Sequence, residues 1–466
     1  MIERFIHRYP KSRSRLNIAV VFPNSYRLGM SNLGFHSVYN EVQNIPDVMC
    51  ERVFFDKDAK SPASVETGRG LGEFDLIFIS VSFETDIINC VAMLERSGIP
   101  ISPNDRKKPY IVTGGIAAVF ASGYLMEFSD AVACGDAPLL VRPVAEAALK
   151  SADKDAFLTA VSGIDGIYTR NGGTGAVSYL RDTQWKNPAH TVILSDKTEF
   201  ADRGLFEISR SCKYKCAFCL VSRAYGEYEA LPMERVLETA EYYQGLTDKL
   251  GMVAATSTNH PDFGRIVEEL NRRGFRLSFS AFRIEPLDDA LLKAIIDNEN
   301  KTLTVAPETV SPRLKKLIHK DIPETVILDK IRTACMYGIK RLKLYFLIGL
   351  PGETMEDMDG IIRLVTEIHE VSSVNVKATG YQPEIIVDIN PLVPKPLTEL
   401  QDAPMESEKS LRKKTVYLKN RLRSLGRVFV YGESPRNSHL QYRISRGLME
   451  FDEIVRLSRK GETADI

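Results

Sequence analysis

Apolar runs and helical patterns alternate along the first 150 residues of the chain. The apolar runs cover residues 16–23, 74–82, 109–115 and 130–136, and each ends in Pro, Ser, Gly or Asp. Between them, residues 33–45 and 86–98 carry apolar side chains at helical spacing. Strands that are almost continuously apolar are buried on both faces, so helices must cover both sides of the sheet. The pattern predicts an α/β fold with a doubly wound, Rossmann-like parallel sheet over residues 1–163, with ligands at the carboxyl ends of its strands.

A Gly- and Pro-containing stretch, residues 164–203, is expected to be a linker that adds a few strands of its own. Strand and helix patterns then alternate again. Strands are expected within residues 204–212, 251–258, 275–282, 301–309, 341–354 and 373–382, and helices within 261–274 and 324–338. At least six strands separated by helices predict a partial or full βα barrel over residues 204–403. Residues 404–466 are charged, and their pattern indicates a mainly helical C-terminal region.

Composition narrows the class of protein. Hydrophobic residues make up 44% and charged residues 26% of the 466 residues, which are ordinary values for a folded globular chain. Lys plus Arg and Asp plus Glu both number 61, so no overall charge favours nucleic acid or an anionic membrane. The N-terminus lacks the apolar core of a signal peptide, and no stretch reaches ~18 apolar residues. We therefore expect a cytoplasmic protein whose seven cysteines are reduced.

Three of those cysteines stand close together in "SCKYKCAFCL". Cys212, Cys216 and Cys219 form C-x3-C-x2-C directly after a strand pattern, so their thiols are expected on the catalytic face of the barrel. Short cysteine spacings of this kind wrap iron–sulfur clusters. A structural zinc site normally has four ligands, and the nearest histidines, His190 and His260, are more than twenty residues away. Zinc, or simply buried thiols, is therefore the weaker alternative.

The motif resembles that of the radical S-adenosylmethionine (SAM) superfamily, in which an aromatic residue, here Phe218, precedes the last cysteine. The resemblance implies a [4Fe-4S] cluster whose three thiolates leave one iron open, and that SAM binds this iron. It also implies an external one-electron donor of the flavodoxin or ferredoxin type. An open coordination site is what allows a metal centre to bind a substrate or cofactor.

Later segments resemble the rest of the SAM platform. In "LYFLIGLPGET", the backbone near Leu347 and Ile348 would meet adenine. Glu308, just after a strand, would meet the ribose or the amino group, and Arg313 the carboxylate, of SAM. The alternative for this pair is a carboxylate that caps a helix and a solvated arginine. Further contacts are expected from Ser280 and Arg283, and with less support from Thr256 and Ser257, because "AATSTNHP" replaces the Gly-Gly-Glu type of turn.

The N-terminal sheet resembles the cobalamin-binding domain that is fused to many radical SAM enzymes. Short polar residues and glycines at strand ends allow backbone to approach a large ligand. The candidate contacts are Asn24, Ser25, Tyr26, Ser80, Ser82, Glu84, Thr85, Gly114, Gly115, Gly135 and Asp136. The Asp-x-His-x-x-Gly signature is absent, and we expect His36 to be a packing or surface residue rather than a cobalt ligand. A domain that has lost its ligand and only docks on the barrel is the alternative.

Other functions are consistent with parts of the pattern. Methylthiotransferases hold a second cluster on three cysteines in their first domain, but Cys50, Cys90 and Cys134 lack that family's Cys-x-x-Asn start and are expected to be buried packing residues. Residues 409–427 carry eight basic residues that could bind nucleic acid, although a solvated helix is favoured. A redox sensor or scaffold without catalysis is a third alternative.

The resemblance leads to one hypothesis for the reaction: cobalamin-dependent radical methyl transfer to an unactivated carbon or phosphorus. A tRNA-modifying, methylthiotransferase-like reaction or a cobalamin-free rearrangement is the alternative. Tyr381, Gln382 and Lys395 are candidates for closing the far side of the barrel near the substrate, and loop packing explains them equally well. The small-molecule or peptide substrate is not identified by any motif.

Overall fold

The computed structural model describes residues 2–6, 14–170, 177–185, 187–298, 302–374 and 380–461. The chain forms two compact units. The first unit comprises residues 1–207, 242–247 and 443–466, and the second comprises 208–241 and 248–442. The expected helical region 404–466 is therefore divided between the two units.

The first unit contains a six-stranded sheet in the order β3-β2-β4-β5-β6-β7. Its strands are β2 (Leu16–Phe22), β3 (Val48–Phe54), β4 (Leu76–Ser80), β5 (Tyr110–Gly114), β6 (Ala131–Ala133) and β7 (Ile167–Tyr168). All neighbours are parallel except β6 and β7. Strands β2, β4 and β5 fall where the sequence predicted them because their apolar runs are buried on both faces.

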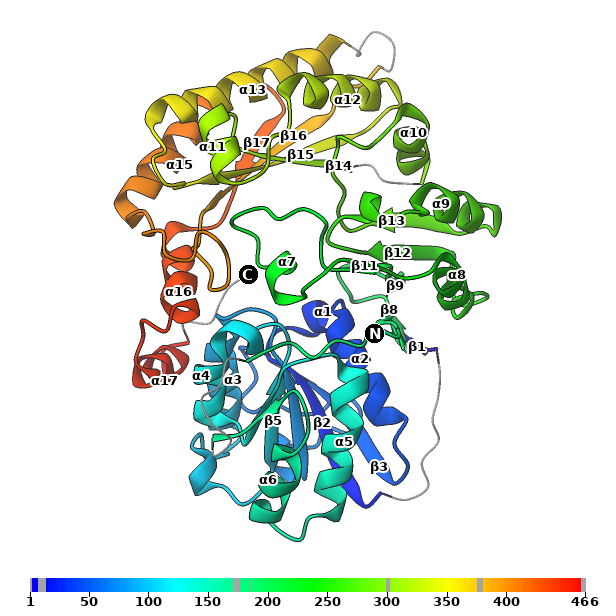
Figure 1. Cartoon of the computed structure of the whole chain (residues 1–466), viewed down its shortest axis with the longest axis vertical. Helices are drawn as coiled ribbons and strands as arrows, with labels where there is room; N and C mark the ends of the chain where they lie inside the picture. The colour runs from blue at the N-terminus through cyan, green and yellow to red at the C-terminus, as the bar shows by residue number, and fades with distance from the viewer. Residues whose placement is uncertain are drawn as a thin grey trace. The chain divides into compact units, whose positions relative to one another are not determined.

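Helices cover both faces of this sheet (Figure 1). Side chains of α2 (Leu33–Gln43), α5 (Ala137–Lys150) and α6 (Lys154–Ser162) share one core with Ile18, Val20 and Phe22 of β2. On the other face lie α3 (Asp86–Arg96), α4 (Ala118–Phe128) and α17 (Phe451–Arg459). The short strand β1 (Glu3–Phe5) pairs antiparallel with β8 (Ile193–Ser195), and α1 (Tyr26–Gly29) follows β2. The predicted doubly wound fold is confirmed.

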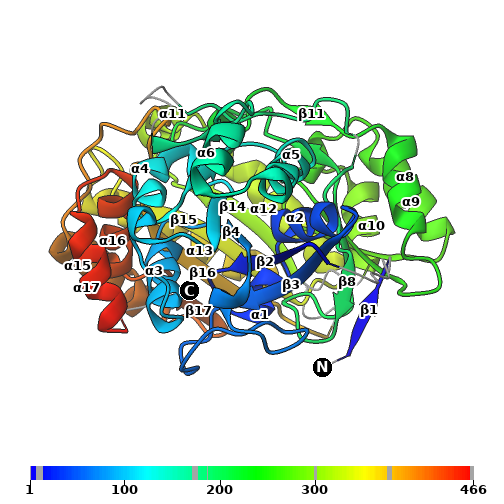
Figure 2. The ribbon, with the colours of Figure 1, turned by 90° about the horizontal axis from the view of Figure 1, so that it is seen from below.

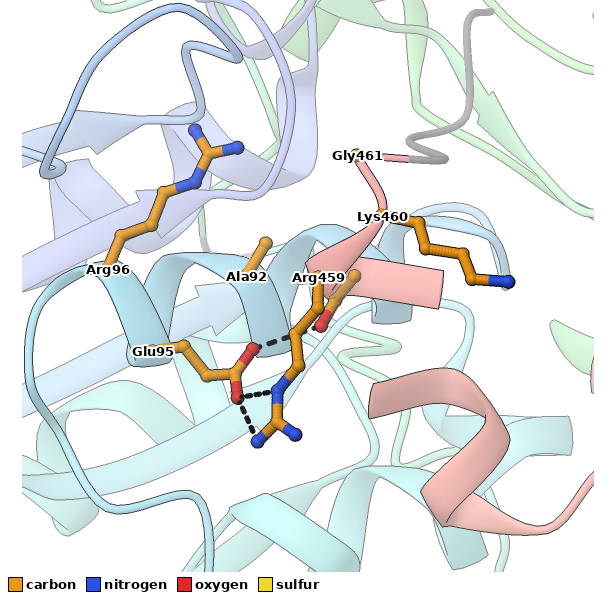
Figure 3. A pocket seen from close by; sticks show the side chains of 7 residues that line it. Ala92, Glu95, Arg96, Arg459, Lys460 and Gly461 are labelled. Carbon is orange, nitrogen blue, oxygen red and sulfur yellow. Dashed lines mark hydrogen bonds and ion pairs between the residues drawn. The ribbon is translucent and has the colours of Figure 1, made fainter. Parts of the chain in front are cut away.

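The C-terminal helix α17 belongs to the first unit and lies beside α3 (Figure 2). The Phe451 and Phe128 rings stack with centroids 6.5 Å apart, and the Tyr124 hydroxyl donates to the carbonyl oxygen of Met449 at 2.7 Å. Where the two helices end, Glu95 accepts hydrogen bonds from Ser458 and Arg459, at 3.2 and 2.8 Å (Figure 3). An open surface pocket there is lined by Ala92, Glu95, Arg96, Ser458, Arg459, Lys460 and Gly461.

The second unit is built from parallel strands with helices on their outer side (Figure 1). Strand β12 (Lys249–Val253) pairs with β13 (Arg276–Phe279), and a second sheet has the order β14-β15-β16-β17. Its strands are β14 (Thr302–Glu308), β15 (Arg341–Ile348), β16 (Glu384–Pro391) and β17 (Val428–Tyr431). The helices are α7 (Val221–Ala224), α8 (Met233–Glu241), α9 (Phe263–Arg272), α10 (Asp289–Asp297), α11 (Pro312–Leu317), α12 (Glu324–Met336), α13 (Met355–Val374) and α15 (Glu408–Leu422); α16 (Pro435–Ser445) runs on into the first unit.

One predicted barrel strand and the predicted C-terminal region differ from the structure. In the expected strand 373–382, residues 373–374 end helix α13, residues 380–382 are not in a strand, and 375–379 lie outside the described residues. The strand beside β15 is instead β16, in which buried and half-buried residues alternate. That alternation arises because only one face of the strand packs against helices. Strand β17 lies within the region expected to be mainly helical.

Candidate functional site

The three cysteines lie on one loop of the second unit. The loop runs from β10 (Ser209–Arg210) to α7, and β10 pairs antiparallel with β11 (Glu229–Ala230), so the two ends of the segment are joined. Ser211 adopts a φ of 64°, and its hydroxyl donates to the carbonyl oxygen of Gly226 at 2.6 Å. All three thiols are free and partly exposed. The local sequence thus produces a closed loop that presents three sulfur atoms.

Polar groups lie beside two of these sulfur atoms, those of Cys212 and Cys219. Asn259 Nδ2 lies 3.8 Å and Thr256 Oγ1 3.7 Å from Cys212 Sγ. Burial raises the pKa of Cys219, whereas hydrogen bonds from the backbone of Val221 and Ser222, at the start of α7, lower it. Donors to sulfur are a normal part of iron–sulfur sites, where they help to set the reduction potential.

Charged groups form a second layer around the loop. Burial raises the pKa of Cys216, while the positive charges of Lys320 and Arg283 lower it. The Arg283 guanidinium lies over the Tyr214 ring, 3.9 Å from its centroid, and also pairs with Glu285. Tyr214 is itself part of the cysteine motif, so this contact joins the loop to the segment that follows β13.

Glu308 stands where β14 ends. It has a φ of 63° at an irregularity in the pairing with β15, and it is buried. Its Oε1 lies 2.9 Å from Lys320 Nζ. Burial raises the pKa of Glu308, and the charges of Lys320 and Arg283 lower it. This carboxylate therefore lies among the charged groups that act on Cys216.

The other predicted SAM contacts occupy strand ends of the same unit. The Ser280 hydroxyl accepts from the backbone N–H of Ala254 at 3.0 Å and donates to its carbonyl oxygen at 2.9 Å, which ties the ends of β12 and β13 together. Thr256 and Ser257 are buried, and the Ser257 N–H donates to the Ala281 carbonyl oxygen at 2.8 Å. Leu347 is partly buried, and Ile348 fully, at the end of β15.

Arg313, Tyr381, Gln382 and Lys395 are the remaining candidates in the second unit. Arg313, at the start of α11, is 53% exposed and pairs with Asp357 of α13 at 3.0 Å. The Tyr381 hydroxyl donates to the carbonyl oxygen of Lys340, the residue just before β15 begins. Tyr381 therefore lies near the amino end of this strand. Burial lowers the pKa of Lys395 to about 7. Gln382 Nε2 is buried without a hydrogen-bond partner among the described residues.

In the first unit, the predicted ligand contacts that follow β2 and β4 flank the topological switch point between these two strands. Asn24 Nδ2 donates to Asp86 Oδ1 at 3.1 Å, and Asn32 Nδ2 donates to Ser82 Oγ at 3.0 Å, so the two strand ends are joined. In open α/β sheets, ligands bind at this point. Ser25 is exposed; Ser82, Gly114 and Gly115 are partly exposed; and Ser80, Glu84 and Thr85 are buried.

Several of these candidates already have partners within the first unit. The Tyr26 hydroxyl donates to Glu3 at 2.5 Å and lies 2.9 Å from Ser195 Oγ. Asp136 accepts from the Tyr179 hydroxyl and the Asp182 N–H, and a Cβ on Gly135 would stand 2.6 Å from the Leu180 carbonyl oxygen. The segment around Leu180 thus covers the end of β6, whereas the ends of β2, β4 and β5 keep exposed or partly exposed candidates.

His36 is fully buried, as a packing residue would be. Its Nε2 lies 2.9 Å from the Met30 carbonyl oxygen, and its Nδ1 accepts from the Val192 N–H at 3.3 Å. Burial lowers its pKa to about 4. Since both ring nitrogens are engaged, His36 cannot ligate a cobalt ion in this conformation.

Sequence reasoning missed Asn259, Tyr214 and Lys320. Tyr214 lies within the quoted motif, but the cysteine spacing does not indicate a contact for its ring. Asn259 and Lys320 reach the site only through the fold, and no spacing in the sequence indicates them. Among the described residues, no three His, Cys, Asp or Glu side chains could hold a single metal ion. A four-iron cluster differs from a single ion because each thiolate binds a different iron.

Family models match both units. The model of the radical SAM superfamily matches residues 206–365, and the model of the N-terminal region of radical SAM proteins matches residues 34–169. The chain belongs to the radical SAM superfamily. It is therefore a radical SAM enzyme, and the resemblance stated from its cysteine motif is confirmed.

Relatives of this radical SAM enzyme span most of its length. An uncharacterized protein of Methanocaldococcus jannaschii is 26% identical over 88% of this chain and 84% of its own. An uncharacterized methyltransferase of Pyrococcus horikoshii is 24% identical over 64% of this chain and 69% of its own. The ribosomal protein uS12 methylthiotransferase RimO of Rippkaea orientalis is 23% identical over 53% of this chain and 58% of its own.

A solved structure shares the fold of the whole chain. It is the radical SAM methyltransferase TsrM from Kitasatospora setae, with cobalamin and a [4Fe-4S] cluster bound. The TM-score is 0.61 at 14% identity, over 96% of this chain and 99% of TsrM. This likeness confirms the predicted fold class, a Rossmann-like domain followed by a radical SAM barrel. Among the described residues, no helix is long and apolar enough to cross a membrane.

Proposed function

We propose that this radical SAM enzyme transfers a methyl group from cobalamin to an unactivated carbon of its substrate. The observation that carries the proposal is the loop with Cys212, Cys216 and Cys219: three free thiols, with hydrogen-bond donors beside Cys212 and Cys219, in a chain whose two units match radical SAM models. These donors fit a [4Fe-4S] cluster with one open iron. When bound there, SAM supplies the adenosyl radical.

The chain's own residues would hold and orient SAM beside the cluster. Glu308 offers a buried carboxylate to the ribose or the amino group, and the neighbouring strand ends offer short polar side chains and backbone. The proposed contacts are Phe218, Thr256, Ser257, Ser280, Arg283, Glu308, Leu347 and Ile348. Arg313 is also proposed to bind the carboxylate of SAM, which requires its guanidinium to leave Asp357. Phe218 and Leu347 pack on one apolar cluster, which would keep water from this side of the site.

Cobalamin is proposed for the first unit because TsrM, which has the same overall fold, binds it. The exposed or partly exposed ends of β2, β4 and β5 would take the cofactor, through Asn24, Ser25, Ser82, Gly114 and Gly115. Its methyl group is what the reaction would consume. His36 is fully engaged, so the chain would hold the corrin without this imidazole on cobalt.

A methylthiotransferase reaction is the second candidate, because RimO proteins are among the relatives. In those enzymes a second cluster would need three neighbouring cysteines. Cys50 lies on β3, Cys90 on α3 and Cys134 after β6, and all three are buried. Strands β3 and β6 are separated by three strands in the sheet, so Cys50 and Cys134 are roughly 19 Å apart at the usual strand spacing. One cluster cannot bridge them, which favours methyl transfer.

Anaerobic reconstitution followed by iron quantification and absorption spectroscopy tests the proposal. We expect about four irons per chain, a corrin absorption band after incubation with methylcobalamin, and reductive cleavage of SAM. Cys216→Ala should lose the cluster, while Cys335→Ala, which removes a buried thiol of α12, should keep it. About eight irons per chain would favour the methylthiotransferase reaction, and full iron content in Cys216→Ala would refute the ligand assignment.

A further inference from the structure

A buried lysine stands beside the cysteine loop. Lys320 is 9% exposed, and its ammonium lies 2.9 Å from Oε1 of Glu308, which is 8% exposed. A buried ammonium is costly unless a negative charge compensates it. Glu308 supplies one such charge, and this pair lies in the charged layer around Cys216 that was described above.

The fold fixes the position of Lys320 relative to the cysteines. Helix α11 ends at Leu317, and the next residue, Ile318, accepts a hydrogen bond from the N–H of Ala217 at 3.0 Å. Ala217 directly follows Cys216, and it is packed with Ile318 in a small apolar cluster. The Lys320 N–H donates back to the Lys315 carbonyl oxygen at 3.0 Å. One backbone hydrogen bond therefore joins the loop of ligands to the turn that carries the lysine.

The electrostatics of the loop agree with this placement. The positive charge of Lys320 acts on both Cys216 and Cys219. With three thiolates and Glu308, the site collects four negative charges; Lys320 and Arg283 are the positive charges that act on Cys216. A fixed positive charge stabilises the more negative state of a nearby redox centre, most strongly where water is excluded.

We propose that Lys320 is the fixed counter-charge of the cluster site, and that it raises the reduction potential of the cluster held by Cys212, Cys216 and Cys219. This inference rests on the proposed function, since it needs a cluster on these cysteines. With a cluster bound, the step would be a one-electron transfer in which the external donor is oxidised by one electron and the cluster is reduced by one electron. Lys320 thus acts through its positive charge and does not bind iron.

Redox titration of the reconstituted full-length enzyme, followed by electron paramagnetic resonance of the reduced cluster, tests this role. In Lys320→Met, the ratio of reduced to oxidised cluster at a fixed potential should fall about tenfold, or about 59 mV for a one-electron couple. Lys320→Arg should stay near the wild-type value because it keeps the charge. Lys316→Met removes the same charge from an exposed position of α11 and should leave the potential unchanged.

Loss of Lys320 leaves Glu308 buried without its partner, so a second variant is needed. Lys320→Met/Glu308→Gln removes both charges and should shift the potential less than Lys320→Met. If neither assembles a cluster while Lys320→Arg does, assembly itself needs the positive charge, which also supports the role. Equal potentials in Lys320→Met and wild type would overturn it and leave the proposed function intact. A wild-type chain that binds no cluster would instead refute the proposed function, and this inference with it.

Discussion

Asp86 shows how a single buried side chain makes the stability of the first unit depend on pH. It is fully buried, and its Oδ2 has no hydrogen-bond partner among the described residues. Burial raises its pKa to about 7, against the hydrogen bond from Asn24. The unfolded chain ionises at a pKa near 3.8. Rising pH therefore favours unfolding throughout the window from about 4 to 7.

We expect Asp86→Asn to stabilise the first unit at pH 7 by up to about 4 kcal/mol, and by much less at pH 4, because asparagine has no charge to bury. Denaturant unfolding at both pH values measures the difference. Asp75→Asn provides a control of opposite sign: Lys108 helps to lower the pKa of Asp75, so its contribution is present at neutral pH and is lost in acid. Equal effects of Asp86→Asn at both pH values would contradict the prediction.

The environment of Lys414 differs from the one that the sequence predicted. It lies in the basic segment 409–427, for which a solvated helix was favoured, yet it is buried and donates to Glu353 at 2.7 Å and to Glu406 at 2.6 Å. The rest of that expectation holds for exposed residues such as Lys413. A single charge pattern cannot distinguish these two positions, because their burial depends on where Glu353 lies.

Lys414→Met should destabilise the second unit by about 3–5 kcal/mol, since it leaves two carboxylates without their cation in a buried site. Lys413→Met, one residue away and exposed, should change stability by less than ~0.5 kcal/mol. Thermal and denaturant unfolding of the two variants provide the comparison. Similar losses of stability in the two variants would mean that the buried contacts of Lys414 contribute nothing beyond its charge.

At the scale of elements, the Gly-Leu-Pro-Gly-Glu-Thr stretch forms the turn that ends β15. Gly349 has a φ of 83°, its N–H donates to Glu353 Oε2 at 2.7 Å, and Glu353 is held by Lys414 of α15. A Cβ at Gly349 would stand 2.9 Å from Leu411 Cδ2. The stretch therefore fixes the end of β15, where Leu347 and Ile348 are proposed to meet adenine.

Gly349→Ala should cost about 1–2 kcal/mol from the backbone alone, because L side chains disfavour positive φ. Hydrogen exchange of the β15 amides should rise in the same variant, and SAM binding should weaken. Gly426→Ala is the matched control, since a Cβ there meets open space and the backbone is unstrained. Unchanged exchange in Gly349→Ala would show that the turn tolerates a side chain.

The sequence predicted elements well where burial alone determines the pattern. The two-sided apolar runs of β2, β4 and β5 and the helices α2, α3, α9 and α12 were recognised, and so was the cysteine loop. Strand β16 was missed because its Asp388 and Asn390 interrupt the apolar run: only one face is packed. Contacts such as Ala217 with Ile318 depend on long-range packing and leave no local pattern in the sequence.

At the scale of the whole molecule, the chain returns to its first unit at the end. Helix α17 covers α3, with Ile454 fully buried and Arg459 and Ser458 bound to Glu95. A chain that ends at Ser445 should therefore exchange its α3 amides faster and unfold its first unit at a lower temperature. Lys460→Ala should have no such effect, because this side chain points away from Glu95 (Figure 3). Unaltered exchange in the shortened chain would contradict the structural role of α17.

During synthesis, α3 emerges long before α17, the helix that covers it. Helix α3 ends at Arg96, and its covering helix begins only at Phe451. At a translation rate of about 5–20 residues per second, roughly 20–70 s pass between the synthesis of α3 and that of α17, and the apolar side of α3 lacks its covering helix during this time. During that interval the nascent chain presents an uncovered surface next to the ribosome. We therefore expect early chain arrest to yield products that chaperones retain, and completion of the last helix to release them.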